Sequence, residues 1–93
     1  MPAHVIVTFT PQDRDKLKAY SQAAGPTVAA HGGEFLSRGP LKVLAGSTDH
    51  QMHAVIQFPT REQAESWYAS AEYQALLELR AEGMNALFTL VGD

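Results

Sequence analysis

The chain is 93 residues long, 45% of them hydrophobic and 18% charged, and its formal net charge is −3 at pH 7. This length fits a single domain spanning residues 1–93, and this composition excludes an intrinsically disordered chain. Because the basic residues form no cluster and cysteine is absent, we expect no nucleic acid, no anionic membrane, no disulfide and no thiolate metal site.

The first third of the chain predicts a buried strand and a helix. The nearly continuous apolar run His4–Thr10 is typical of a central strand that is buried on both faces. Thr10 is expected to cap the following helix, with Pro11 in its first turn. Gly25-Pro26 is expected to break or kink that helix. The residues expected to face the core are Leu17, Tyr20 and Ala24.

The middle of the chain predicts a strand and a loop. One of the two glycines after His31 is expected to take the left-handed conformation that ends a helix. Residues Glu34–Arg38 predict a strand, which turns or bulges at Gly39-Pro40 and continues over Leu41–Ala45. A polar loop is expected over Gly46–Gln51.

The remainder repeats the pattern of the first half. Residues His53–Phe58 predict a second buried strand, and Thr60 with Gln63 forms the capping box of a helix. Ser70 is expected to cap a further helix, and Asn85–Val91 predicts the last strand. The inward side chains of the two helices are predicted to be Ala64, Trp67 and Tyr68, then Tyr73, Leu76, Leu77 and Arg80.

Two similar strand–helix halves predict the ferredoxin-like arrangement β-α-β-β-α-β, an α+β fold with an antiparallel sheet. Both helices of such a fold cover one face of the sheet. The runs His4–Thr10 and His53–Phe58 are apolar on both sides, and leaving the second side in water would forgo several kcal/mol at ~25 cal/mol per Å2. We therefore expect a homodimer that packs sheet to sheet.

Two segments resemble a known family. Residues 30–39 (AHGGEFLSRG) and 58–80 (FPTREQAESWYASAEYQALLELR) are similar to the patterns HGG-x-F/Y-L-x-R-G and F-P-S-x-x-x-A-x-x-W-Y-x-S-x-x-Y-Q-x-L of the bacterial family domain of unknown function 1330. The resemblance covers nearly the whole chain and implies a subunit of a dimeric α+β barrel, near cofactor-free monooxygenases and lactone isomerases. It implies no established activity. The chain departs from the family at Ala45, usually acidic in relatives, in the loop Ser47–Met52, and at His53.

His31 and Arg38 are the candidate catalytic residues. In one interpretation they line a pocket between the sheet and the helices, where Arg38 binds a carboxylate or enolate oxygen and His31 moves a proton. In the other, His31 caps a helix C-terminus and Arg38 pairs with Glu34 on the same face of its strand.

Trp67, Tyr68 and Tyr73 are the candidate ligand-binding residues. Aromatic side chains at helical spacing usually belong to the core, and Trp67 is expected to pack there. Tyr68 and Tyr73 carry hydroxyls that need a hydrogen-bond partner when buried, so either is a candidate for orienting a ligand.

Asp49, His50 and His53 come nearest to a metal cluster, and His4 would lie beside His53 if the two strands were parallel neighbours. A solvated loop explains this spacing better than a metal site, because no second pair of ligands accompanies it. The chain has no Gly-rich phosphate loop and no Gly-x-Ser-x-Gly motif. We expect neither metal nor cofactor.

Two functions remain open at this point. The first is a homodimer that binds a small organic carboxylate or phenol in a sheet–helix cleft, with catalysis that needs no cofactor. The alternative is a non-catalytic dimeric interaction module without a small-molecule site. A pocket of a few hundred Å3 favours the first, and a filled interior favours the second. With no signal-like N-terminus and no long apolar run, a cytoplasmic location is expected.

Overall fold

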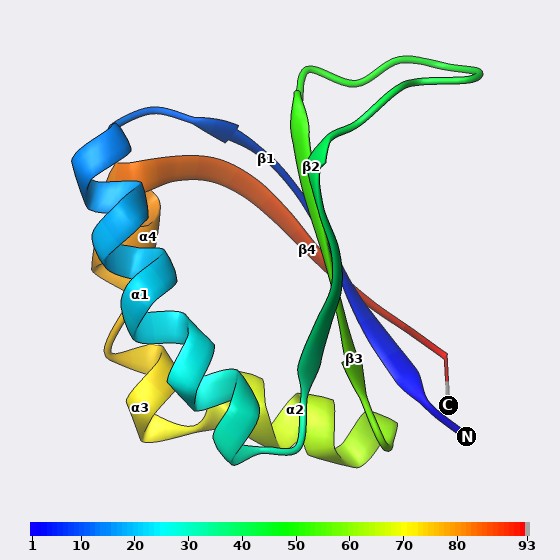
Figure 1. The fold of residues 1–93 in the computed structure, drawn as a ribbon, viewed down its shortest axis with the longest axis vertical. Helices are drawn as coiled ribbons and strands as arrows, with labels where there is room; N and C mark the ends of the chain where they lie inside the picture. The colour runs from blue at the N-terminus through cyan, green and yellow to red at the C-terminus, as the bar shows by residue number, and fades with distance from the viewer. Residues whose placement is uncertain (93) are drawn as a thin grey trace.

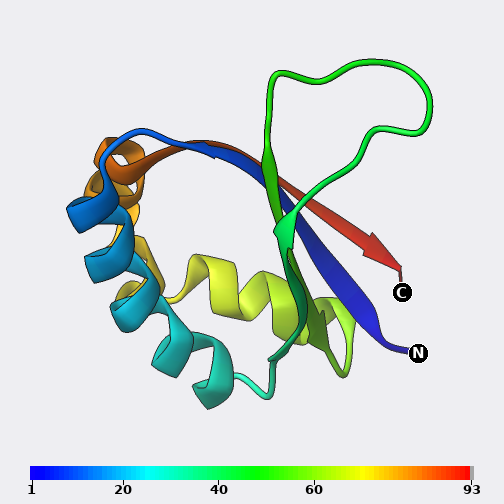
Figure 2. The ribbon, with the colours of Figure 1, turned by 45° about the horizontal axis from the view of Figure 1, so that its top comes forward.

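Residues 1–92, which the computed structural model describes, form a sheet of 4 strands with the helices on one side of it (Figures 1 and 2). Ala3 pairs with Gly92, so the described chain enters and leaves the sheet at the same end (Figure 1). The elements in chain order are β1 (Ala3–Pro11), α1 (Arg14–Ala30), β2 (Glu34–Pro40), β3 (Met52–Phe58), α2 (Arg61–Ala69), α3 (Ala71–Gln74), α4 (Leu77–Gly83) and β4 (Met84–Gly92).

The sheet has the strand order β2-β3-β1-β4, and all neighbouring strands are antiparallel. This topology is the ferredoxin-like α+β fold, with the two apolar runs of the sequence as its central strands. The antiparallel register pairs His4 with Gln57 and His53 with Thr8. The parallel neighbourhood considered for His4 and His53 is therefore wrong.

The helix α1 differs from its prediction at its start and in its middle. Thr10 stays in the sheet, and the N-cap is Asp13, whose carboxylate accepts hydrogen bonds from the amides of Asp15 and Lys16. The helix also continues through Pro26 to Ala30. A proline disfavours helical backbone at the preceding residue by contact with its Cβ, and Gly25 has no Cβ.

The strand β2 is shorter than predicted and contains a bulge. It ends at Pro40, so Leu41–Ala45 belong to the loop that projects from the sheet in Figure 1. The register to β3 shifts between Phe35 and Ser37, which makes Leu36 an extra residue in the strand. An extra residue changes which side chains share a face. Arg38 consequently lies on the helix-covered side, opposite Ala54.

Local signals in the second half of the chain are confirmed. The Thr60 hydroxyl accepts a hydrogen bond from the Gln63 amide, and the Ser70 hydroxyl accepts one from the Tyr73 amide. The predicted second helix is divided into α3 and α4, with Ala75 and Leu76 between them. In β4 the less exposed residues alternate as expected. They are Ala86, Phe88 and Leu90.

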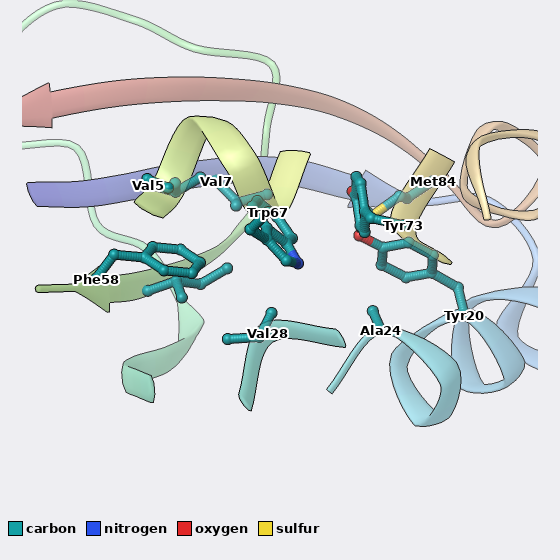
Figure 3. Close-up of a cluster of buried hydrophobic side chains, with 11 residues drawn as sticks. Val5, Val7, Tyr20, Ala24, Val28, Phe58, Trp67, Tyr73 and Met84 are labelled. Carbon is teal, nitrogen blue, oxygen red and sulfur yellow. The ribbon is translucent and has the colours of Figure 1, made fainter. Parts of the chain in front are cut away.

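The core lies between the sheet and the helices (Figure 3). Trp67 is 1% exposed and packs between the rings of Phe58 and Tyr73, with ring centroids at 5.4 Å and 4.3 Å. Gly33 makes room beside this cluster, because a Cβ there would lie 2.6 Å from the Phe58 ring. The opposite, outer face of the sheet carries the apolar side chains Ile6, Val55, Leu87 and Val91.

Candidate functional site

A cavity of about 630 Å3 lies between α1 and the helix-covered face of the sheet. It exists because α1 makes its main packing contact with α4 and not with a strand. Small residues of α1 also border it, which are Ala24, Gly25 and Ala29. Most of the wall is apolar and includes Val7, Leu17, Phe35, Ala54, Ile56 and Phe88.

Arg38 lines this cavity from β2. Its guanidinium carbon lies 4.3 Å from the centroid of the Phe35 ring, which is a cation–π contact. Within residues 1–92 the guanidinium forms no ion pair, and the predicted pairing with Glu34 is wrong because the bulge at Leu36 separates their faces. A guanidinium with free donors beside an apolar wall suits a carboxylate or phenolate oxygen.

His31 does not line the cavity. It is the C-cap of α1, and its ring Nδ1 lies 2.9 Å from the carbonyl oxygen of Thr27. Since a carbonyl oxygen only accepts, Nδ1 carries a proton and donates it. Gly32 follows with φ +78°, the left-handed conformation predicted for one of the two glycines. The structure does not bring His31 and Arg38 together, and the geometry of His31 is that of the capping interpretation.

The three aromatic candidates separate in the structure. Trp67 lines the cavity, and its indole Nε1 donates a hydrogen bond to the Thr27 hydroxyl at 3.1 Å. Tyr73 is 0% exposed and lies behind the cavity wall. Tyr68 lines a second, smaller cavity of about 370 Å3 that α2 forms with β1 and β4. Only Trp67 therefore shares the larger cavity with Arg38.

Sequence analysis missed a hydrogen-bonded group at the end of the cavity. The Tyr20 and Tyr73 hydroxyl oxygens are 2.7 Å apart, and Figure 3 shows them side by side. Arg80 Nη1 donates to Tyr73 Oη at 3.0 Å and to Tyr68 Oη at 3.2 Å. A signal was present in the sequence, because Arg80 occupies an inward position on an otherwise apolar helix stripe.

Burial sets the electrostatics of this group. Burial raises the pKa of Tyr20, and the neighbouring Tyr73 adds to the rise. Burial also raises the pKa of Tyr73, although the nearby Arg80 guanidinium opposes that rise. Burial lowers the pKa of Arg80, but the hydrogen bonds to Tyr73 and Tyr68 outweigh it and raise the pKa above its ordinary value. At neutral pH the group is thus two neutral phenols beside a cation.

The histidines of β3 and its preceding loop make protein contacts. His53 Nδ1 lies 2.9 Å from the Gly39 carbonyl oxygen, and its Nε2 lies 2.6 Å from the Ser37 hydroxyl. His50 Nδ1 lies 3.2 Å from the Thr10 hydroxyl. No three potential metal ligands gather anywhere in residues 1–92. The expected lack of a metal and of a cofactor stays a prediction.

Comparisons with known proteins place this geometry in context. A sequence family described as domain of unknown function 1330 matches residues 2–93. A search of functionally curated proteins gave no significant match.

In the part of the chain that the structure describes, no helix has the length and apolarity needed to cross a membrane. The cytoplasmic location stays a prediction.

Several solved structures share the fold. A protein of unknown function from Rhodopseudomonas palustris superposes with a TM-score of 0.80 at 15% identity, covering 99% of this chain and 82% of that one. SnoaB, a cofactor-independent oxygenase from Streptomyces nogalater, gives 0.72 at 10% identity, covering 99% and 92%. A dimeric ferredoxin-like protein of unknown function from Thermobifida fusca gives 0.67 at 14% identity, covering 100% and 92%.

Proposed function

The chain belongs to the family of domain of unknown function 1330, and from this premise we propose that it is a homodimer that binds a small organic carboxylate or phenol in the cavity between α1 and the sheet. The observation that carries the proposal is the cavity itself, about 630 Å3 of mainly apolar space with the Arg38 guanidinium on its wall. Ligand sites in proteins have this volume and this combination of apolar surface with few polar groups. A purely structural module would be expected to fill its interior.

Each part of the cavity matches one part of such a ligand. The apolar walls suit an aromatic or aliphatic body, whose removal from water favours binding. Arg38 has donors in a planar fork that fits a carboxylate or an enolate oxygen. Within residues 1–92 no carboxylate forms an ion pair with this guanidinium, so its donors are available to a ligand anion even though Glu34 also lines the cavity.

We extend the proposal to catalysis without a cofactor. A fold of this kind accommodates such chemistry in SnoaB, which shares the architecture at 10% identity. The reaction class that fits here acts on an activated carbonyl compound, since a guanidinium on the cavity wall suits an oxygen that gains negative charge. Isomerisation, decarboxylation and oxygenation all pass through such an oxygen.

A ligand screen on three proteins tests the binding site. Small aromatic carboxylates and phenols should raise the melting temperature of the wild type, because a ligand that binds only the folded state stabilises it. Arg38→Ala should lose most of that rise, with affinity at least tenfold weaker by calorimetry, since a hydrogen-bonded charge contributes about 1.5–3 kcal/mol.

Arg14→Ala is the matched control. Arg14 is exposed at the start of α1 and does not line the cavity, so this variant should respond as the wild type does. Equal responses of Arg38→Ala and Arg14→Ala would remove Arg38 from the site. The absence of any response in the wild type would favour the non-catalytic module instead.

A further inference from the structure

The Tyr20–Tyr73 pair has two hydroxyl protons, and only one of them is used in the hydrogen bond between the two oxygens. Arg80 is a donor only, so Tyr73 Oη accepts from it at 3.0 Å. Tyr73 is 0% exposed, and the acceptor available to its own proton within residues 1–92 is the Tyr20 oxygen at 2.7 Å. A buried hydroxyl proton without an acceptor is costly, so Tyr73 donates to Tyr20.

This assignment leaves the proton of Tyr20 free. The Tyr20 hydroxyl makes no further hydrogen bond within residues 1–92, and Tyr20 lines the cavity whereas Tyr73 does not. We therefore infer that the Tyr20 hydroxyl is free to donate a hydrogen bond to a group in the cavity. In Figure 3 the Tyr20 hydroxyl is at the inner end of the ring, between α1 and α3.

Arg80 gives the chain of donors a positive end. The guanidinium carbon lies 4.5 Å from the Phe88 ring centroid and 5.7 Å from that of Tyr68, so it is packed among aromatic rings. Within residues 1–92 no carboxylate forms an ion pair with it. A hydrogen-bonded chain that begins at a cation polarises each following O–H, and the last donor becomes stronger.

We propose that Tyr20 donates a hydrogen bond to a ligand oxygen in the cavity, and that Arg80 strengthens this donor through Tyr73. The inference rests on the proposed function and specifies it: the preferred ligand has an oxygen that bears negative charge, such as a phenolate or an enolate. Tyr20 is then the group that touches the ligand, while Tyr73 and Arg80 are positioning residues. For a reaction through an enolate, the same donor stabilises the charge as it develops.

The ionisation of a coloured phenol in the cavity tests this proposal. We choose 4-nitrophenol, whose phenolate absorbs visible light, so absorbance reports the ionised fraction of the bound probe. The wild type should lower the pKa of bound 4-nitrophenol by about one unit, which corresponds to a tenfold preference for the phenolate. In Tyr20→Phe that shift should become smaller, because Arg38 alone then stabilises the phenolate, and affinity for 4-nitrophenolate should fall several-fold.

Two further measurements separate charge stabilisation from packing. Binding of 4-nitrotoluene, which lacks the phenolic oxygen, should change less than twofold in Tyr20→Phe. Tyr73→Phe keeps the Tyr20 hydroxyl but removes its link to Arg80, so it should lose part of the pKa shift of the probe. Circular dichroism establishes whether each variant is folded. If Tyr20→Phe does not fold, the loss of the pKa shift in Tyr73→Phe tests the proposal in its place.

The outcomes distinguish this inference from the proposed function. If the wild type binds no 4-nitrophenol, the cavity is not a phenol site and the donor chain falls with it. If the probe binds and Arg38→Ala weakens it, but its pKa is the same in wild type and Tyr20→Phe, only the role of Tyr20 is overturned.

Discussion

Tyr20 and Tyr73 link the stability of this protein to alkaline pH. Both hydroxyls are buried and have raised pKa values, so they stay neutral in the folded chain at a pH where unfolded tyrosines ionise. A group with a raised folded pKa contributes stability that is complete below its unfolded pKa, about 10 for tyrosine, and that is lost as pH rises further. Each of the two therefore makes unfolding easier in alkali.

We predict that the free energy of unfolding falls with pH above about 10, with a limiting slope near 1.4 kcal/mol per pH unit for each of these tyrosines. Tyr20→Phe should remove one such contribution and give a shallower slope. Urea unfolding followed by circular dichroism between about pH 9 and pH 11 measures this. Parallel curves for wild type and Tyr20→Phe would show that Tyr20 ionises in the folded protein.

At the scale of single residues, the sequence predicted which side chains face the core better than it predicted which side chains contact each other. Tyr20 and Tyr73 were placed correctly on inward faces, because helical periodicity alone determines a face. Their mutual hydrogen bond joins residues 53 positions apart, and no periodicity encodes it. The interpretation of Arg38 as the partner of Glu34 failed for a similar reason, since alternation along a strand assumes that no residue is inserted.

The helices α2 and α3 each begin after a capping hydroxyl, and the two hydroxyls differ in the hydrogen bonds that they make. The Thr60 hydroxyl accepts from Gln63 N at 3.1 Å and donates to Gln63 Oε1 at 3.3 Å, so both of its hydrogen bonds stay within the first turn of α2. The Ser70 hydroxyl accepts from Tyr73 N at 3.3 Å and also donates to the Trp67 carbonyl oxygen at 2.7 Å, so it joins α2 to α3. The second cap is therefore expected to contribute more to stability.

We predict that Thr60→Ala lowers the free energy of unfolding by about 1 kcal/mol and that Ser70→Ala lowers it by more, toward about 2 kcal/mol. Ser66→Ala is the control, because Ser66 is exposed inside α2 and alanine suits a helix interior. Denaturant midpoints at neutral pH give the comparison. Losses of equal size in Thr60→Ala and Ser66→Ala would mean that the cap contributes little.

Helices and strands were predicted correctly from the sequence where the signals for them are local. The two capping hydroxyls, Thr60 and Ser70, and the alternation of β4 needed no tertiary information. The continuation of α1 through Pro26 was not predicted, because a proline usually ends or kinks a helix, whereas here Gly25 has no Cβ and permits helical backbone before the proline. The strand predicted at Leu41–Ala45 is wrong: Leu41 N donates to the Gln51 carbonyl oxygen at 3.0 Å, and the residues after it are loop.

At the scale of the whole molecule, the outer face of the sheet is the surface that the proposed homodimer would bury. Leu87 and Val91 are 58% and 41% exposed there, next to Ile6 and Val55 on the central strands. The polar residues His4, Thr8 and Gln57 share this face, so its apolar side chains form a patch within a mixed surface, and exposed apolar patches often mark an interface. The proposed homodimer covers it with the same face of a second copy, which satisfies the self-complementarity that a twofold interface requires.

We predict that the wild type has twice the mass of the chain in light scattering, and that Leu87→Lys is monomeric because its charge would be buried against a second copy. Leu44→Lys is the control: Leu44 is 90% exposed in the loop between β2 and β3, away from the sheet face, so this variant should stay dimeric. A monomeric wild type at micromolar concentration would overturn the dimer.

The single extra residue in β2 has an effect far larger than its size. Because Leu36 is accommodated as a bulge, every side chain after it in the strand is turned over relative to a regular strand, and this alone directs Arg38 toward the helices. Deletion of Leu36 would remove the bulge and keep Arg38 opposite Ala54, whereas regular pairing with Leu36 retained would send the guanidinium to the opposite surface. The face of the sheet on which this arginine lies therefore depends on how one neighbouring residue is accommodated in the strand, with no change in the arginine itself.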